Sequence, residues 1–373
     1  MKLSIIVPVY NMASDGKLQY CLESLVHQTI KDYEIIAVDD CSTDSSMEIL
    51  ADYARKYPEK FHAVHSEVNR KQGGAKNIGM DRAVGEWIGF IDSDDWITPD
   101  FYERLIRRGE ETGADMVGCD YHLTDKHSME IGQIVHNNKK EQTGILDEEK
   151  YKSLILDGGS LVVKVYRREI VIDHPGRFPE GIFYEDNALG NSWMLRAKHF
   201  EYIEEPLYYY YQHAVSTVHT ITQRRCEDRM EAGRIMLQEA KQYQYLEKYR
   251  TELEFSFAVL FYVNTLFTYM QGVRPVKYGF VKRLGSEMKQ TFPGFEKNPY
   301  YCQRVHEEEK KLVRMQMRST FLFIYIINCS GHIGISERKE NRRRMAPHEN
   351  FNENKSDLCN QRMLYRLFFV AWK

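Results

Sequence analysis

Residues 86–96 read E-W-I-G-F-I-D-S-D-D-W, an apolar run that ends in a cluster of acidic residues. Its first part, residues 87–91, has the length and composition of a buried strand, and the strand stops at the acidic segment 92–95. Three carboxylates in four positions repel one another unless a cation or hydrogen-bond donors neutralise them. The segment therefore predicts a divalent metal site. A helix N-cap ahead of Pro99 is the alternative.

The composition is that of a globular protein of 373 residues, long enough for more than one structural unit. Its 51 basic and 54 acidic residues nearly balance, which predicts no nucleic-acid partner. Seven scattered cysteines without a C-x-x-C pair indicate free thiols in a reducing cytosol. The first apolar run, interrupted by Pro8, resembles a strand more than a signal peptide, and no run reaches the roughly 20 residues of a membrane span. We expect a cytoplasmic protein, soluble or bound at a membrane surface.

Strand and helix patterns alternate over the first third of the chain. Apolar runs at five places predict strands, with periodic segments between them that predict helices: 3–9, 34–38, 61–65, 87–91 and 116–119. This order is typical of a mainly parallel α/β sheet with helices on both faces. Ligands of such sheets bind beyond the carboxyl ends of the strands. We therefore expect the segments 8–11, 39–40 and 92–95 to converge at one crevice.

The later part of the chain changes character twice. A polar loop or hairpin is expected at 124–142, and further strands are expected at three places: 161–166, 200–203 and 207–211. Glu185 and Asp186 open a periodic helix, where acidic residues are commonly only partners of the helix dipole. After about residue 224 the pattern is helical. These patterns predict three parts: an α/β domain at 1–220, a helical domain at 221–320 and a tail at 321–373.

The tail combines an apolar run at 321–327 with five basic residues at 338–344 and an aromatic end. Such a combination is typical of a peripheral contact with an anionic membrane, here the inner face of the plasma membrane. A helix that packs on the protein or on a second subunit is the alternative.

Five motifs follow one another in an order that resembles the family 2 inverting glycosyltransferases of the GT-A fold. They are V-P-V-Y-N (7–11), E-I-I-A-V-D-D-C-S-T-D (34–44), N-R-K-Q-G-G-A-K-N-I-G (69–79), A-V-G-E-W-I-G-F-I-D-S-D-D-W (83–96) and Y-E-D-N (184–187). The resemblance covers roughly residues 1–215 and extends to bacterial enzymes that build surface polysaccharide or lipid-linked glycans. It implies a GT-A, Rossmann-like fold with a helical C-terminal region.

The resemblance also implies a nucleotide-diphosphate sugar donor, with a UDP-sugar expected, and a hydroxyl of a glycan or lipid-linked saccharide as acceptor. Residues 8–10 would line the nucleoside pocket, and Asp39 or Asp40 would accept from the base. The donor-binding positions carried over are Pro8, Val9, Tyr10, Asp39, Asp40, Asn69, Gly74, Lys76, Asp92 and Ser93. Asp92 and Asp94 would bind Mg²⁺ or Mn²⁺ in the D-x-D role.

Asp186, with Glu185 before it, matches the general base that takes the acceptor's proton in an inverting transfer. Asp95 and Trp96 are expected on the acceptor side, with Asp95 as a helix cap in the alternative interpretation. Lys76 stands where the family usually has arginine, which leaves the donor open. The competing functions are an inactive glycan- or nucleotide-binding subunit and a nucleotidyltransferase on a similar fold.

Overall fold

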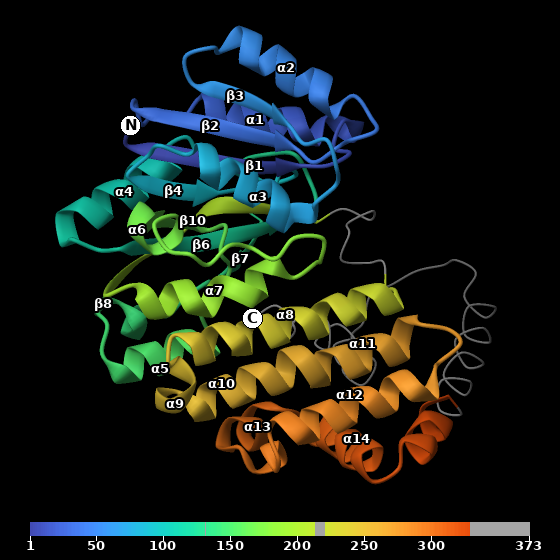
Figure 1. Ribbon diagram of the computed structural model, residues 1–373. Coiled ribbons are helices and arrows are strands. Elements are labelled where there is room, and N and C mark those ends of the chain that lie inside the picture. Colours follow the sequence, from blue (N-terminus) through green and yellow to red (C-terminus); the bar gives the residue numbers. More distant parts are fainter. Residues whose placement is uncertain (131, 213–220, 329–373) are drawn as a thin grey trace, which may run out of the picture. The chain divides into compact units, whose positions relative to one another are not determined.

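The computed structural model describes residues 1–130, 132–212 and 221–328 (Figure 1). Contacts between Cα atoms divide the chain into two compact units. Among the described residues, the first unit contains 1–130, 132–212 and 227–253, and the second contains 221–226 and 254–328. Residues 227–253, which the sequence pattern places in a helical domain, thus group with the α/β part of the chain.

The first unit is built on one sheet. Its strands in the described part of the chain are β1 (Leu3–Val9), β2 (Tyr33–Asp39), β3 (Phe61–His65), β4 (Trp87–Phe90), β5 (Trp96–Ile97), β6 (Met116–Thr124), β7 (Gln133–Val135), β8 (Gly144–Ile145), β9 (Lys164–Arg167) and β10 (His199–Tyr211). Their order is β3-β2-β1-β4-β9-β6-β10-β5, with β7 paired to β6 and β8 paired to β10. Parallel pairing joins β3-β2-β1-β4 and also β6 with β10, whereas β9 is antiparallel to both of its neighbours. The expected mixed sheet is confirmed, and its continuous parallel part is the N-terminal half.

Helices cover both faces of this sheet. The helices of the α/β part are α1 (Lys17–Val26), α2 (Ser46–Lys56), α3 (Lys71–Arg82), α4 (Phe101–Thr112), α5 (Glu148–Leu156), α6 (Arg168–Val171) and α7 (Glu185–Arg196). A Cβ on Gly79 of α3 would lie 2.5 Å from the side chain of Ile6, and a Cβ on Gly89 of β4 would lie 2.5 Å from the ring of Tyr102 in α4. Gly89 pairs with Ile5, so a Cβ on Gly89 would point to the face of the sheet opposite to the side chain of Ile6. Helices α3 and α4 therefore lie on opposite faces.

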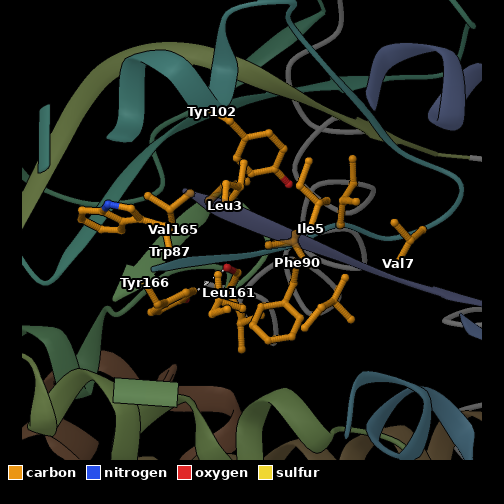
Figure 2. Packing of buried hydrophobic residues seen from close by; sticks show 14 of the residues in the cluster. Leu3, Ile5, Val7, Trp87, Phe90, Tyr102, Leu161, Val165 and Tyr166 are labelled. Atoms are coloured by element: carbon orange, nitrogen blue, oxygen red, sulfur yellow. Dashed lines mark hydrogen bonds between the residues drawn. The ribbon is translucent and has the colours of Figure 1, made fainter. Parts of the chain in front are cut away.

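The core of the first unit gathers side chains from β1, β4 and β9 (Figure 2). Trp87 and Phe90 of β4 are fully buried, as the apolar run 87–91 predicts. Gly109 in α4 allows the helix to approach Trp87, because a Cβ there would lie 2.4 Å from the indole ring. The strand that leads to the acidic segment is thus packed closely against α4 before it ends.

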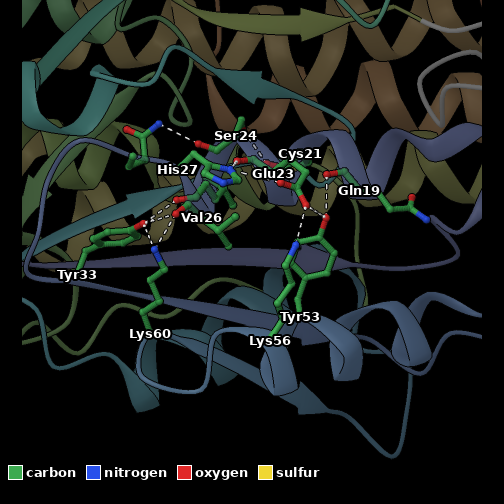
Figure 3. Close-up of polar contacts among 12 residues, drawn as sticks. Gln19, Cys21, Glu23, Ser24, Val26, His27, Tyr33, Tyr53, Lys56 and Lys60 are labelled. Atoms are coloured by element: carbon green, nitrogen blue, oxygen red, sulfur yellow. Dashed lines mark hydrogen bonds and ion pairs between the residues drawn. The ribbon is translucent and has the colours of Figure 1, made fainter.

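Polar contacts close the end of α1 onto its neighbours (Figure 3). The hydroxyl of Tyr33 donates to the carbonyl oxygens of Leu25 and Val26 at 3.0 and 3.1 Å, and Lys60 Nζ donates to that of Val26 at 2.6 Å. These carbonyls belong to the last turn of α1, where the helix offers them no partner of its own. The contacts fix the path from α1 into β2.

Two sequence expectations about strands are wrong in detail. The expected strands at 200–203 and 207–211 form the single strand β10, whose pairing with β6 shifts register on each side of Pro206. Proline has no N–H to donate, so it interrupts the ladder without ending the strand. The strand expected at 161–166 begins only at Lys164, as β9.

The helical elements after residue 222 include α8 (Gln223–Gln242), α9 (Tyr245–Lys248), α10 (Arg250–Phe257), α11 (Asn264–Gly272), α12 (Tyr278–Thr291), α13 (Pro299–Arg304) and α14 (Glu307–Arg318), and residues 320–328 are helical as well. A π-helical turn at Ala258–Val263 joins α10 to α11. The resulting stretch, Arg250–Gly272, is long and apolar enough to cross a membrane by length and composition, but 61% of its apolar window is buried in the protein, as in a core helix. The sequence pattern predicts no stretch of that length, because isolated polar residues such as Asn264 interrupt the apolar run here.

Candidate active site

The acidic segment follows β4 and forms a tight turn before β5. The backbone N–H of Asp95 donates to the carbonyl of Asp92 at 3.1 Å, which closes the turn. Asp92 and Asp94 remain partly exposed, whereas Ser93 and Asp95 are buried. The turn therefore separates the carboxylates into two that face an accessible region and one that faces the protein.

Asp95 is held by β10. Its carboxylate accepts from the hydroxyl of Tyr208 at 2.5 Å and from the backbone N–H of Tyr211 at 2.8 Å. Burial raises the pKa of Asp95 well above its usual range, and the nearby Asp92 and Asp94 raise it further. Helix α4 begins at Phe101 with Asp100 at its N-cap, so the alternative interpretation of the acidic segment as the cap of this helix is wrong. Asp95 instead anchors the turn to the neighbouring strand.

Trp96 continues this anchor and is fully buried. Its indole stacks on the ring of Tyr209 with centroids 5.7 Å apart, and its Nε1 donates to the carbonyl of Ser128 at 3.2 Å. Tyr20 of α1 meets the same indole edge to face at 4.8 Å. Asp95 and Trp96 thus fix the end of the turn that carries Asp92 and Asp94. Their expected acceptor role stays a prediction.

A buried ion pair lies beside Asp92. Lys76 Nζ of α3 is 2.7 Å from Glu185 Oε1 of α7, and the two side chains are only 3% and 4% exposed. Burial lowers the pKa of Lys76, but Glu185, Asp92 and Asp186 raise it more, so the ammonium stays charged. The pair thus joins motifs that are far apart in the sequence. Because Lys76 is committed to Glu185, its expected contact with the donor stays a prediction.

Asp92 is a partly exposed carboxylate whose pKa lies well above its ordinary value. Burial raises its pKa to about 7, with Asp94, Glu185 and Asp186 adding to the effect and Lys76 opposing it. Its Oδ1 also accepts from Gln72 Nε2 at 3.3 Å. A carboxylate in this environment gains stability in its charged form when a further cation approaches.

Asp186 lies in the first turn of α7, next to Glu185. Burial raises its pKa to about 6, Glu185 raises it further, and Lys76 together with backbone N–H groups of the helix start opposes the rise. A carboxylate with a pKa near 6 is charged at neutral pH and yet basic enough to take a proton. The arrangement therefore suits a general base better than a mere partner of the helix dipole.

The ends of β1 and β2 form the expected nucleoside side. Pro8 and Val9 are buried in β1, while the side chain of Tyr10 just after it is 43% exposed. Asp39 is fully buried; its Oδ2 lies 2.8 Å from His65 Nδ1, and its Oδ1 has no hydrogen-bond partner among the described residues. A buried acceptor without a partner is costly, and a ligand's N–H can satisfy it after a local shift.

Asp40 organises the loop that leads into α3. Its Oδ1 accepts from the backbone N–H of Arg70 at 2.7 Å, and its carbonyl accepts from Asn69 Nδ2 at 3.1 Å. Asp40 therefore supports the loop from within, which leaves Asp39 as the better candidate for a contact with the base. A Cβ on Gly74 would lie 2.1 Å from the Cβ of Arg70, so glycine is required there for the close turn.

The structure fits a metal ion that is shared with a substrate. Among the described residues, no three His, Cys, Asp or Glu side chains lie close enough together to hold a metal by themselves. Asp92 and Asp94 offer hard carboxylate oxygens, and Asp92 is surrounded by the carboxylates of Asp94, Glu185 and Asp186, whose repulsion a cation would relieve. Mg²⁺ is usually bound by one or two carboxylates together with substrate phosphates and water. The two aspartates match that pattern.

Sequence reasoning missed how the segment before α7 is held. Asn77 of α3 exchanges hydrogen bonds with the backbone of Phe178 at 2.9 and 3.0 Å, and the Gly181 N–H donates to the Arg70 carbonyl at 2.8 Å. Asn77 stands inside the A-K-N motif, but nothing in the sequence shows which distant backbone it reaches. These contacts bring the Y-E-D-N motif to the acidic segment.

Comparisons with known proteins agree with this geometry. The family model described as "Glycosyl transferase family 2" matches residues 4–174. The chain is 34% identical over 268 residues to the "Putative glycosyltransferase EpsH" of Bacillus subtilis, covering 69% of this chain and 74% of EpsH. It is 32% identical over 224 residues to the "Uncharacterized glycosyltransferase YibD" of Escherichia coli, covering 58% of this chain and 64% of YibD.

Solved structures show the same fold. The crystal structure of residues 1–349 of TarS from S. aureus, in complex with UDP-GlcNAc, superposes with a TM-score of 0.55 at 22% identity and covers 86% of this chain and 92% of that one. Against a longer TarS chain the coverage of the relative is 55%. The GT-A fold expected from the motifs is thereby confirmed. With an identity of 34% across 74% of EpsH, the chain belongs to glycosyl transferase family 2.

Proposed function

We propose that the protein transfers a hexosyl or N-acetylhexosaminyl group from a UDP-sugar to a hydroxyl of a glycan or lipid-linked saccharide. The reaction would be a metal-dependent single displacement with inversion, in cell-surface polysaccharide synthesis at the cytoplasmic side of the membrane. The observation that carries the proposal is the grouping of Asp92 and Asp186 around the buried Lys76–Glu185 pair. It places a metal candidate and a base candidate in one electrostatic cluster.

The choice of a UDP-sugar is supported by Asp39 and by named relatives. The partnerless Oδ1 of Asp39 is suited to accept the imide N–H of a uracil base. The "Poly(ribitol-phosphate) beta-N-acetylglucosaminyltransferase TarS" of Staphylococcus aureus is 26% identical to this chain over 216 residues. Its fragment is known in complexes with UDP and with UDP-GlcNAc. These relatives favour UDP-GlcNAc as the first donor to test.

Asp92 and Asp94 would hold a divalent metal, Mn²⁺ or Mg²⁺. When bound, such an ion neutralises the two phosphates of the donor as negative charge builds on the leaving diphosphate. Asp95 and Trp96 hold the turn that carries the two aspartates, because Asp95 is hydrogen-bonded to β10 and Trp96 is packed among aromatic rings. The protein thus supplies a preformed pair of ligands.

Asp186 would act as the general base. As the acceptor oxygen forms its bond to the anomeric carbon, the bond from that carbon to the phosphate oxygen breaks and UDP leaves. The hydroxyl proton passes to the carboxylate of Asp186. Glu185 is committed to Lys76 at 2.7 Å, which makes it a positioning residue rather than a second base.

Incubation of the protein with UDP-GlcNAc, UDP-glucose, UDP-galactose or GDP-mannose and Mn²⁺ tests this proposal. We expect slow release of UDP from at least one UDP-sugar as water replaces the acceptor, and background release in EDTA because the leaving diphosphate is then not neutralised. Release of pyrophosphate from a nucleoside triphosphate would instead indicate a nucleotidyltransferase. Binding of UDP without any turnover of the four donors would favour an inactive binding subunit.

We also propose that the end of the chain contacts an anionic membrane. Phe321, Leu322 and Tyr325 are 73%, 47% and 60% exposed and follow α14, while the rest of the predicted tail, 329–373, lies outside the described residues. Exposed aromatic and aliphatic side chains enter a lipid interface readily. We expect Phe321→Ser with Tyr325→Ser to lower co-sedimentation with phosphatidylserine vesicles severalfold. Unchanged co-sedimentation would contradict the contact.

A further inference from the structure

The chain enters the catalytic helix α7 through an unusual backbone conformation. Tyr184, the N-cap residue of α7, has φ 68° and ψ 32°, in the left-handed region. Residues with a side chain adopt this region only where their surroundings hold them there. Asp186 lies two residues further on, so the direction of its carboxylate depends on what fixes Tyr184.

Helix α8 supplies the contacts that fix it. Arg229 Nη2 donates to the hydroxyl of Tyr184 at 2.8 Å, and the guanidinium carbon lies 4.5 Å from the centre of the same ring. One residue earlier, the buried Asp228 accepts from the backbone N–H of Phe183 through Oδ2 at 3.4 Å. Both residues belong to the first compact unit, with Tyr184 and Asp186.

A small apolar cluster completes this contact. Ile182, Ala188 and Ala232 are buried against one another, with Tyr184 and Ile235 packed at the edge. Ala232 and Ile235 follow Asp228 at helical spacing, so polar and apolar contacts come from one face of α8. On the other side of the segment, α3 holds Glu185 through Lys76. The Y-E-D-N motif is therefore held by contacts from two helices, α3 and α8.

We propose that Arg229 and Asp228 are positioning residues for the reaction: they hold Tyr184 in its left-handed conformation and so aim Asp186 at the acceptor. This inference rests on the proposed role of Asp186 as base. The family model ends at residue 174, so neither residue lies in the region it matches. The α8 helix would then contribute to catalysis by positioning the base.

A double-mutant cycle on the Arg229–Tyr184 contact tests the proposal through the turnover of the UDP-sugar that wild type accepts. We expect Arg229→Ala and Tyr184→Phe each to lower kcat for UDP release roughly 10- to 100-fold with the donor KM unchanged, because a small misplacement of the base costs rate and not donor affinity. The double variant should be no slower than Arg229→Ala, since Arg229→Ala already removes the hydrogen bond that Tyr184→Phe removes. Arg229→Lys, which keeps a donor, should recover part of the loss. Arg234→Ala is the matched control on the same helix, where the arginine pairs with Glu231.

A second readout does not depend on activity. Amide hydrogen exchange of residues 183–189 should quicken at least severalfold in Tyr184→Phe and stay at the wild-type rate in Arg234→Ala. Tyr184→Phe removes only a hydroxyl and keeps the ring, so it serves if Arg229→Ala fails to fold. Unchanged exchange, or losses in kcat that multiply in the double variant, would overturn the inference. Absence of wild-type turnover together with faster exchange in Tyr184→Phe would overturn the proposed function and leave the positioning contact supported.

Discussion

Replacing Asp186 with asparagine should lower the rate of sugar release and transfer about 100- to 10,000-fold while donor binding is retained. The size follows from the usual contribution of a general base. Asparagine keeps the shape of the side chain but cannot take a proton. Binding should survive because the expected nucleoside contacts come from the ends of β1 and β2 and none of them from α7. Titration calorimetry with UDP and Mn²⁺, beside the rate of UDP release, measures both effects.

The matched control for this change is Asp173→Asn. Asp173 is an exposed carboxylate that pairs with Arg168 Nε at 3.3 Å, so the same isosteric change there should leave the rate near wild type. If the Asp186 variant kept a rate close to that of the control, the assignment of the base would be wrong. A loss of UDP binding together with the rate would instead place Asp186 on the donor side.

Replacing Asp94 with asparagine should remove most of the stabilisation that UDP and Mn²⁺ give together. In the wild type, a ligand at 100 times its Kd stabilises a protein by about 2.7 kcal/mol, which is visible as a rise in Tm. An amide is a weaker ligand for a hard cation than a carboxylate, so the metal-dependent part of the rise should fall. Thermal unfolding with UDP, with Mn²⁺ and with both together measures it.

Asp100→Asn is the control for the metal prediction. Asp100 lies on the same connection between β4 and α4, but its carboxylate pairs with Arg104 at 3.8 Å rather than facing Asp92. The control should show the full rise with UDP and Mn²⁺. An equal rise in Asp94→Asn would remove Asp94 from the metal site.

The local elements of the α/β part could be predicted from the sequence because their patterns are local. The run 3–9 forms β1 with the expected bounds, and the apolar strand that ends at the acidic segment is β4. Strand order was not predictable, since β9 inserts between β4 and β6 although it comes much later in the chain. Pairing between distant strands depends on how their surfaces fit, which no single stretch of sequence records.

The site could be predicted as a set of residue types but not as a set of contacts. The carboxylates at 92, 94 and 186 were identified from motifs, and the structure groups Asp92 and Asp186. The burial of Asp95 apart from the other two carboxylates could not be predicted, because Tyr208, which donates a hydrogen bond to it, lies on a strand far along the chain. The hydrogen bond from Arg229 to Tyr184 could not be predicted for the same reason, because only the fold brings α8 to the Y-E-D-N motif.

The stereochemistry of the released sugar shows whether the transfer is a single displacement with inversion. Proton NMR can follow the first sugar set free from the α-linked UDP-GlcNAc, or from whichever UDP-sugar of the panel the wild type accepts, in the presence of Mn²⁺. A single displacement with Asp186 as base predicts that the β-anomer appears first and then mutarotates. Initial appearance of the α-anomer, or no release from any donor of the panel, would contradict a single displacement with Asp186 as base.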